Sequence, residues 1–220
     1  MFDIIFISYN EPTAVENYEQ LKDRFPLAKH VQGVKGIHQA HIAAAKRSFS
    51  PMFWVVDADA IILDSFNFDY QLTKEEYDIV HVWRSCNPIN GLEYGYGGVK
   101  LLPKKLTLAM DITSTDMTMN ISSRFKAMDE ISNITAFNTD PFTTWRSAFR
   151  ECCKLAVTNN AESNARLAVW STVATGNCSE SAISGALAGK AYGQENAANK
   201  AALSLINDFD WLKVQFLQTH

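Results

Sequence analysis

The sequence predicts an α/β fold with a mixed sheet, followed by a mostly helical C-terminal part. Strand-like and helix-like segments alternate through the first 60 residues, which is typical of parallel βαβ units. One strand-like segment, Phe53-Trp54-Val55-Val56, is apolar without alternation, as expected for a strand buried on both faces. The last third, about residues 179–205, is rich in alanine and has a helical pattern.

The first half of the chain is expected to form three strands and two helices. Residues 3–8 (Asp-Ile-Ile-Phe-Ile-Ser) form the first expected strand. A helix should follow with Pro12 in its first turn, where a missing N–H does no harm, because large apolar residues then recur at helical spacing. These residues are Val15, Tyr18, Leu21 and Phe25. A second strand at residues 28–31 and a second helix at residues 37–48 lead to the apolar run.

The second half of the chain is less regular. Residues 78–84 alternate as a strand does, and residues 99–102 should form a returning strand. Asn138-Thr139-Asp140-Pro141 has the composition of a helix start. Three glycines recur four residues apart near the C-terminus and are expected to allow close helix packing: Gly185, Gly189 and Gly193. We expect one compact domain over residues 1–220.

Length and composition are those of an ordinary globular protein. The chain has 220 residues, of which 47% are hydrophobic and 20% charged, enough for one domain with a sizeable core. The net charge of −4 gives no electrostatic footprint of tight nucleic-acid binding. No segment approaches the roughly 18 apolar residues of a membrane span, and the first residues lack the pattern of a signal peptide. We therefore expect a cytoplasmic protein, in the host cytoplasm if it is viral.

Two acidic residues, Asp57 and Asp59, follow the apolar run directly. Residues i and i+2 of an extended chain point to the same side, and ligands of open α/β sheets bind beyond the carboxyl ends of the strands. Such acids can simply cap the next turn. Two acids on one face repel each other, however, unless a cation or a basic group lies between them. The pair therefore predicts a site for Mg²⁺ or Mn²⁺, which can in turn hold a diphosphate.

The order of segments carries a family resemblance. The strand end Ser8-Tyr9-Asn10-Glu11, a helix rich in small residues and the strand into Asp57-Ala58-Asp59 follow one another, which resembles the GT-A glycosyltransferases. The small residues are Ala40, Ala43, Ala44 and Ala45. The resemblance covers about residues 1–103, and its last part, Gly97 to Pro103, is similar to the acceptor-side segment of several such enzymes. The remainder of the chain, including residues 137–155, resembles small phage-encoded proteins of this type.

The resemblance implies a GT-A-like domain with two halves. A Rossmann-like half that binds the donor nucleotide would cover about residues 1–85. An acceptor half with a helical C-terminal part would cover about residues 86–220. The implied activity is metal-dependent transfer of a sugar from a nucleoside-diphosphate sugar, with UDP the expected nucleotide, to an acceptor hydroxyl. A glycan, a protein or a modified DNA base can be the acceptor, and neither the acceptor nor the oligomeric state follows from the sequence.

The resemblance also implies roles for individual residues. Ser8, Tyr9 and Glu11 would lie near the base and ribose of the donor. Asp57 and Asp59 would bind the ribose and the metal, which is Mn²⁺ or Mg²⁺. Many enzymes of the family supply a third metal ligand, often a histidine, from the C-terminal part. The candidate for it here is the last residue of the sequence, His220.

Two further segments are candidates for donor binding. His38 and His41 share a predicted helix face with Lys35 just upstream, and they can bind a diphosphate or a metal, or occupy structural positions. Gly95-Tyr96-Gly97-Gly98 offers a backbone that a ligand can approach closely, beside tyrosine faces on which sugars stack. A plain hairpin loop is the other explanation of this segment, and the two are compatible.

An inverting transferase needs a carboxylate that takes the proton of the acceptor hydroxyl. Asp140, Asp129 and Glu130 are candidates, and we favour Asp140 because it lies in a polar cluster at a helix start beside aromatic residues. Capping of that helix is the alternative role for Asp140. Arg146 and Arg150, four apart on the same helix, can pair with phosphates, although surface ion pairs with nearby acids are the more common arrangement.

Two other functions compete with the transferase. A phosphatase of the haloacid-dehalogenase type also has an apolar strand followed by Asp-x-Asp, with Asp57 as nucleophile and Asp59 as acid/base. That family usually carries the motif on its first strand, and its later acidic metal motif is not evident here. The third possibility is a non-catalytic module that binds nucleotide sugars, for which bound donor without turnover would be the evidence.

Overall fold

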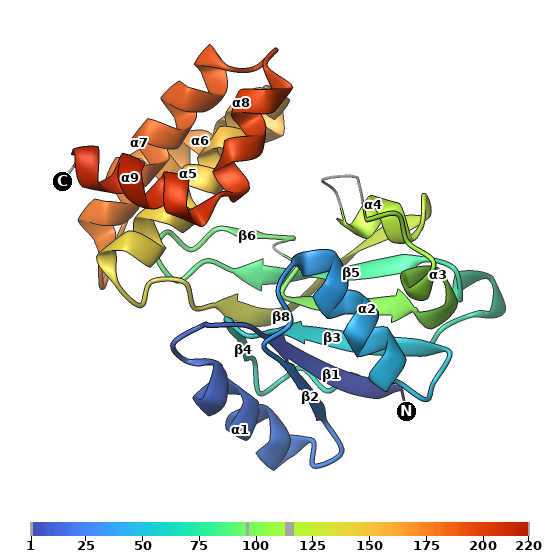
Figure 1. The fold of residues 1–220 in the computed structure, drawn as a ribbon. Helices are drawn as coiled ribbons and strands as arrows, with labels where there is room; N and C mark the ends of the chain where they lie inside the picture. Colours follow the sequence, from blue (N-terminus) through green and yellow to red (C-terminus); the bar gives the residue numbers. More distant parts are fainter. Residues whose placement is uncertain (1, 96, 113–116, 220) are drawn as a thin grey trace. The chain divides into compact units, whose positions relative to one another are not determined.

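The computed structural model describes residues 2–95, 97–112 and 117–219 (Figure 1). Contacts divide the chain into two compact units. The sheet unit comprises Met1–Cys86 and Glu93–Thr135, and the helical unit comprises Asn87–Leu92 and Ala136–His220. The described residues include no helix long and apolar enough to cross a membrane.

The sheet unit contains one mixed sheet with short helices around it (Figure 1). Its strands are β1 (Asp3–Ser8), β2 (Lys29–Gln32), β3 (Met52–Asp57), β4 (Ala60–Ile62), β5 (Val80–Cys86), β6 (Glu93–Tyr94), β7 (Val99–Pro103) and β8 (Phe125–Thr135). Its helices are α1 (Ala14–Arg24), α2 (Ile37–Arg47), the 3₁₀ turn η1 (Lys74–Glu76), α3 (Lys104–Leu108) and α4 (Met117–Ile121). The strand order is β2-β1-β3-β7-β5-β8-β4, and β6 pairs with β5.

The strand directions give the sheet two distinct edges. β1 pairs in parallel with β2 and β3, and β5 pairs in parallel with β8. β7 lies between β3 and β5 and is antiparallel to both. The carboxyl ends of β1, β3, β5 and β8 therefore lie at the same edge of the sheet as the amino end of β7. In open α/β sheets this is the edge at which ligands bind.

Both faces of the central strands are buried, as the unbroken apolar runs predict. Alternate residues of β1 and β3, such as Ile4 and Trp54, pack on one face with Leu21 of α1. The residues between them, such as Ile5 and Phe53, pack on the other face with Ala44 and Ala45 of α2. The small residues of α2 thus let this helix lie close to the sheet.

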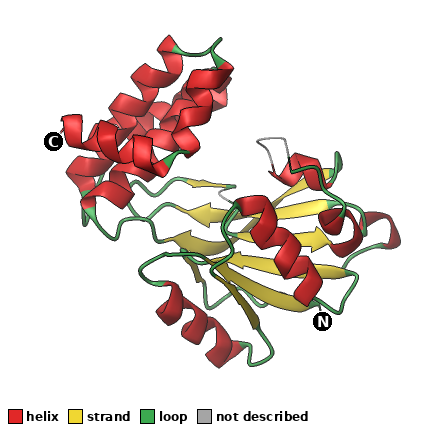
Figure 2. Ribbon diagram, in the orientation of Figure 1, coloured by secondary structure: helices red, strands yellow, loops and turns green. Residues whose placement is uncertain are grey.

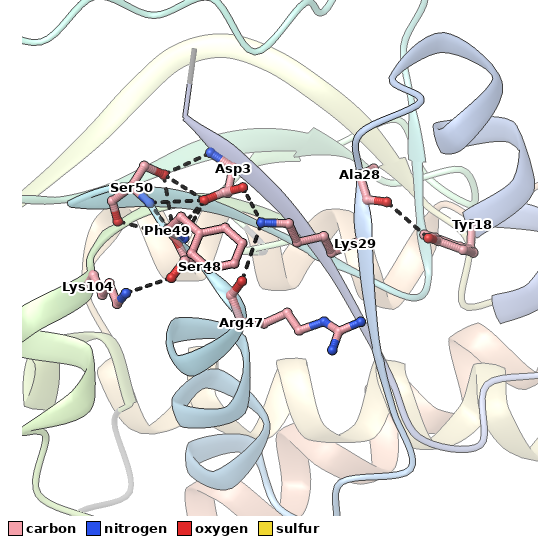
Figure 3. Close-up of polar contacts among 9 residues, drawn as sticks. All are labelled: Asp3, Tyr18, Ala28, Lys29, Arg47, Ser48, Phe49, Ser50 and Lys104. Carbon is pink, nitrogen blue, oxygen red and sulfur yellow. Dashed lines mark hydrogen bonds and ion pairs between the residues drawn. The ribbon is translucent and has the colours of Figure 1, made fainter.

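A polar cluster ties the amino end of β1 to the connection between α2 and β3 (Figure 3). The Asp3 carboxylate accepts hydrogen bonds from the backbone N–H groups of Phe49 (2.6 Å) and Ser50 (3.0 Å), and it pairs with Lys29. Burial opposes ionisation of Asp3, but these hydrogen bonds outweigh it and hold its pKa well below the usual range. These bonds join β1 to β2 and to the segment before β3, at the edge opposite Asp57, so we assign the cluster a structural role.

The described part of the helical unit consists of helices and loops (Figure 2). The helices are α5 (Pro141–Thr158), α6 (Ala161–Thr172), α7 (Ser179–Glu195), α8 (Lys200–Ser204), the 3₁₀ turn η2 (Leu205–Asn207) and α9 (Phe209–Thr219). A core of Trp145, Phe149 and Leu212 joins α5 to α9. The three glycines of α7 face α5, where a Cβ at Gly189 would lie 2.1 Å from the Phe149 carbonyl oxygen. The predicted close packing at these glycines is confirmed.

The α/β class and the mixed sheet are confirmed, and several details differ from expectation. The first helix begins at Ala14 with Thr13 as its N-cap, so Pro12 does not lie in its first turn as predicted. One boundary between the units lies at Cys86, but residues 93–135 also belong to the sheet unit, because β7 and β8 pair with β3 and β5.

Candidate functional site

The carboxyl edge of the sheet brings together most of the residues predicted to bind the donor. Ile7 of β1 lies opposite Asp57 of β3, so the segment Ser8–Glu11 leaves the sheet beside the acidic pair. The Asp57 N–H donates to the Gly98 carbonyl oxygen at 2.9 Å, which places the glycines before β7 on the other side. We call the residues at this edge the acidic site: Ser8, Tyr9, Glu11, Asp57, Asp59, Gly97 and Gly98.

Lys100 of β7 is a member of this site that sequence reasoning missed. Its Nζ donates to both carboxylate oxygens of Asp57, at 2.8 and 2.9 Å, and its side chain is only 4% exposed. Lys100 lies opposite Val55, so it shares a sheet face with Asp57, two residues further along β3. A lone lysine within Val99-Lys100-Leu101-Leu102 is unusual for a buried strand, and this was the available signal.

The charges around the acidic pair are only partly balanced. Burial raises the pKa of Asp57, and the ammonium group of Lys100 opposes this rise. Burial, together with the charges of Asp57 and Glu11, raises the pKa of Asp59 to about 6. Among the described residues, the only N–H that bonds to the Asp59 carboxylate is its own backbone N–H. Asp59 therefore lies in an environment that favours an added cation.

The carboxylate oxygens of the acidic site are suitable ligands for a divalent cation. The described residues do not, however, supply a full set of ligands. Across residues 2–95, 97–112 and 117–219, no group of three or more His, Cys, Asp or Glu side chains is arranged to hold a metal. Asp59 is the side chain best placed to bind one, because Lys100 already occupies both oxygens of Asp57. A donor diphosphate and water would have to complete the coordination. His220, the expected third ligand, lies outside the described residues.

The raised pKa of Asp59 predicts a pH dependence of stability with a definite sign. The folded protein holds this proton more tightly than the unfolded chain, whose Asp pKa is about 3.9. The resulting stabilisation is present at acidic pH and is lost as the pH rises through about 6. Without divalent cations, we expect Asp59→Asn to melt about 2–5 °C above the wild type at pH 7.5 and to lose this advantage at pH 4.5.

Thermal unfolding in chelator at the two pH values measures this difference. The exposed Asp69→Asn variant is the matched control and should follow the wild type at both. An equal effect of Asp59→Asn at pH 4.5 and 7.5 would contradict the assigned environment of Asp59.

The strand end Ser8–Glu11 contains both structural and accessible groups. The Ser8 hydroxyl is buried and bonded to His30 Nε2 at 2.8 Å, and the His30 ring stacks on Tyr18. Glu11 folds back so that its carboxylate accepts the Tyr9 N–H at 2.7 Å. The Tyr9 side chain is 45% exposed. Tyr9 and Glu11 are therefore available to a nucleotide, whereas Ser8 mainly fixes the end of β1.

The two histidines of α2 differ in environment. His41 is fully buried, and its Nδ1 lies 2.8 Å from the Ile37 carbonyl oxygen. Burial, together with the charge of Lys100, lowers the pKa of His41 to about 3, so this ring is neutral at physiological pH. His38 is half-buried, with Nε2 3.5 Å from Asn120 Nδ2. Of the two, His38 is the one that can contact a diphosphate.

Gly97 and Gly98 have structural reasons to be glycine. Gly97 has φ +75°, and a Cβ there would lie 3.2 Å from Lys100 Cε. A Cβ at Gly98 would lie 2.8 Å from Nδ2 of Asn133, a buried residue of β8 that accepts hydrogen bonds from Ser85 and Ser132. The absence of a side chain at these two positions therefore leaves room for Lys100 and for Asn133. Tyr96, the predicted stacking residue, lies outside the described residues.

Asp140, predicted as a catalytic base, belongs to the helical unit and caps α5. Its Oδ1 accepts the Thr143 N–H at 2.9 Å. Burial opposes ionisation of Asp140, but hydrogen bonds from Thr143 and Thr139 keep its pKa below the usual value, which makes it a weaker base. The other two candidates lie in β8, where Asp129 pairs with Arg84 at 3.0 Å and Glu130 accepts from Trp83 Nε1. The capping role of Asp140 is confirmed.

Two cavities among the described residues lie away from the acidic site. One, of about 300 Å³, lies between α1 and β4 and is lined by Asn17, Arg24 and Ile61 among others. The other, of about 710 Å³, lies along α7 in the helical unit. Neither is lined by Asp57 or Asp59.

Comparison with known protein families finds no family that matches this chain, and a search of curated proteins finds no significant similarity.

Proposed function

We propose that this protein is a metal-dependent glycosyltransferase that uses a nucleoside-diphosphate sugar, with UDP the expected nucleotide. One observation carries the proposal. Three segments far apart in the sequence, Ser8–Glu11, Asp57–Asp59 and Gly97–Gly98, meet at the carboxyl edge of one sheet. This is the arrangement that the resemblance to GT-A enzymes requires of a donor site.

The residues of the acidic site would contact different parts of the donor. Tyr9 and Glu11, at the end of β1, would lie beside the base and ribose. Lys100 holds both oxygens of Asp57 and fixes its orientation, which leaves Asp59 to bind the cation. A bound Mn²⁺ or Mg²⁺ would neutralise charge on the departing nucleoside diphosphate. The acceptor would be a hydroxyl of a glycan, a protein or a modified DNA base.

The phosphatase hypothesis meets a specific difficulty in Lys100. The pKa of Asp59, about 6, would suit an acid/base catalyst. The nucleophile would have to be Asp57, however, and both of its oxygens accept hydrogen bonds from a buried ammonium group. A carboxylate that accepts these two hydrogen bonds is a weaker nucleophile, so we prefer the transferase. A non-catalytic binding module would share the donor site and differ only in turnover.

Thermal unfolding with nucleoside diphosphates and their sugars tests the donor site. A ligand at about 100 times its dissociation constant stabilises by roughly 2.7 kcal/mol, or about 5–10 °C at this size. We expect one nucleotide to give such a shift with Mn²⁺ or Mg²⁺, and the shift to disappear in EDTA and in Asp59→Asn. Asp69→Asn, an exposed change elsewhere on the sheet unit, should respond like the wild type.

The same panel separates the alternatives. No shift with any nucleotide, together with magnesium-dependent release of phosphate from small phosphoesters, would replace the transferase with the phosphatase. A nucleotide-dependent shift without turnover of any sugar donor would favour the binding module.

A further inference from the structure

Three cationic side chains of the helical unit gather around two phenylalanine rings between α5 and α9. The Arg146 guanidinium carbon lies 4.1 Å from the centre of the Phe209 ring and 5.5 Å from that of Phe142. Arg150 shares the Phe209 ring at 5.5 Å, and Lys213 Nζ shares the Phe142 ring at 4.3 Å. Each ring therefore faces two cations, and together they hold the three cationic groups at one place.

Two of the three cations in this cluster, Arg150 and Lys213, are not balanced by an acid in contact with them among the described residues. Among the described residues, no carboxylate lies within the 4.0 Å of an ion pair with Arg150 or Lys213. The expected surface ion pair of Arg150 is therefore not found. Its Nη2 instead donates to the neutral Asn207 side chain at 2.9 Å, and its Nε is buried without a partner among the described residues.

The acids closest in sequence do not neutralise the cluster by contact. Asp208 accepts the N–H groups of Asp210 and Trp211, so it caps α9. Burial lowers the pKa of Arg150, the charge of Arg146 lowers it further, and the charge of Glu151 opposes both. Like charges four residues apart on a helix repel each other, so this arrangement costs stability in the free protein. An added anion would relieve that cost.

The side chains suit a phosphate group in particular. Guanidinium groups present planar pairs of N–H donors that match phosphate oxygens, and lysine adds a point charge. Cation–π contacts hold such groups in fixed orientations at a surface. The site is accessible, because Lys213 is exposed and the Phe209 side chain is 47% exposed.

We propose that Arg146, Arg150 and Lys213 form an anion-binding site that takes the phosphate groups of a ligand. The site belongs wholly to the helical unit, so this inference does not depend on the proposed transferase activity. Phosphate can come from a small polyphosphate or from the backbone of a nucleic acid. Both ligands would present the same phosphate oxygens to the site, and binding measurements distinguish between them.

Fluorescence anisotropy with a labelled single-stranded oligothymidylate of 12 nucleotides, competed with inorganic tripolyphosphate, tests the site on the full-length protein. We expect competition at low salt and at least a tenfold loss of affinity in Arg150→Gln and in Lys213→Gln. Arg166→Gln, which removes an arginine paired with Glu162 on α6, is the matched control and should bind like the wild type. Lys213 is exposed, so its variant should fold even if Arg150→Gln does not.

Each outcome of the competition has a defined meaning. Binding of tripolyphosphate that is lost in Lys213→Gln supports the site for free phosphates. Oligonucleotide binding that is lost in Lys213→Gln but resists tripolyphosphate supports the nucleic-acid backbone as the source. Absence of binding to both probes would overturn the proposal. So would equal affinities of the Lys213→Gln and wild-type proteins, or equally tight binding of polyglutamate.

Discussion

Gly189→Ala is expected to destabilise the helical unit, although alanine is normally the better residue in a helix. The substitution gains about 1 kcal/mol of helix propensity. Against this, the new Cβ would lie 2.1 Å from the Phe149 carbonyl oxygen and 2.7 Å from the Phe149 carbonyl carbon. Both are backbone atoms of α5, so no side-chain rotation can relieve the contact. Separating α5 from α7 would also loosen the core around Trp145 and Phe149.

The size of this effect follows from overpacking, which typically costs about 1–3 kcal/mol and occasionally more. The contact at Gly189 is with backbone, so we expect a net loss of about 2–3 kcal/mol. Chemical denaturation followed by circular dichroism measures it. Gln194→Ala, an exposed change on the same helix, is the control and should leave stability unchanged or slightly higher. Unchanged stability of Gly189→Ala would show that α7 does not lie against α5 as described.

Lys100→Met is expected to cost about 3–5 kcal/mol, because it leaves the Asp57 carboxylate without its cation. The methionine fills a similar volume but donates no hydrogen bond. Burial already raises the pKa of Asp57, and loss of the ammonium group would raise it further. The destabilisation should therefore be large at neutral pH and smaller at acidic pH, where the carboxyl group is protonated.

A second substitution distinguishes the ion pair from packing. Lys100→Met combined with Asp57→Asn removes both charges, and we expect it to recover a large part of the lost stability. Lys105→Met, an exposed change on α3, is the control and should have little effect. Chemical denaturation of the four proteins at pH 7 and pH 5 gives the comparison. A double variant no more stable than Lys100→Met would mean that packing, and not the unpaired charge, dominates.

The secondary-structure elements predicted most accurately are those that their own residues identify. The apolar runs of β1 and β3 placed both strands within a residue of their observed ends, because strands buried on both faces contain few polar residues. β8 was missed for the opposite reason. Its first half, which includes Asp129 and Glu130, is largely exposed, so the strand is stabilised by pairing with β5 more than by its own pattern. The pairing of β8 with β5 cannot be derived from the sequence of β8 alone.

The same distinction applies to the acidic site. The resemblance to GT-A enzymes implied that Asp57, Asp59 and the segment Ser8–Glu11 lie around one donor, and the parallel strands β1 and β3 do end at one edge. Lys100 and Asn133 were not predicted, because their positions depend on the antiparallel register of β7 and on the approach of β8 to Gly98. Two carboxylates on one face require a cation or a basic group beside them. Lys100 is that basic group for Asp57, and the requirement remains for Asp59.

The most direct test of the proposed function is release of free nucleoside diphosphate from a panel of sugar nucleotides, measured with and without Mn²⁺. A transferase without its acceptor is expected to hydrolyse its donor slowly, since water can take the place of the acceptor hydroxyl. We predict release from one donor in Mn²⁺, little release in EDTA, and a loss of about 100-fold or more in Asp59→Asn. Release that persists unchanged in EDTA and in Asp59→Asn would contradict the assignment of a metal-dependent donor site to the carboxyl edge of this sheet.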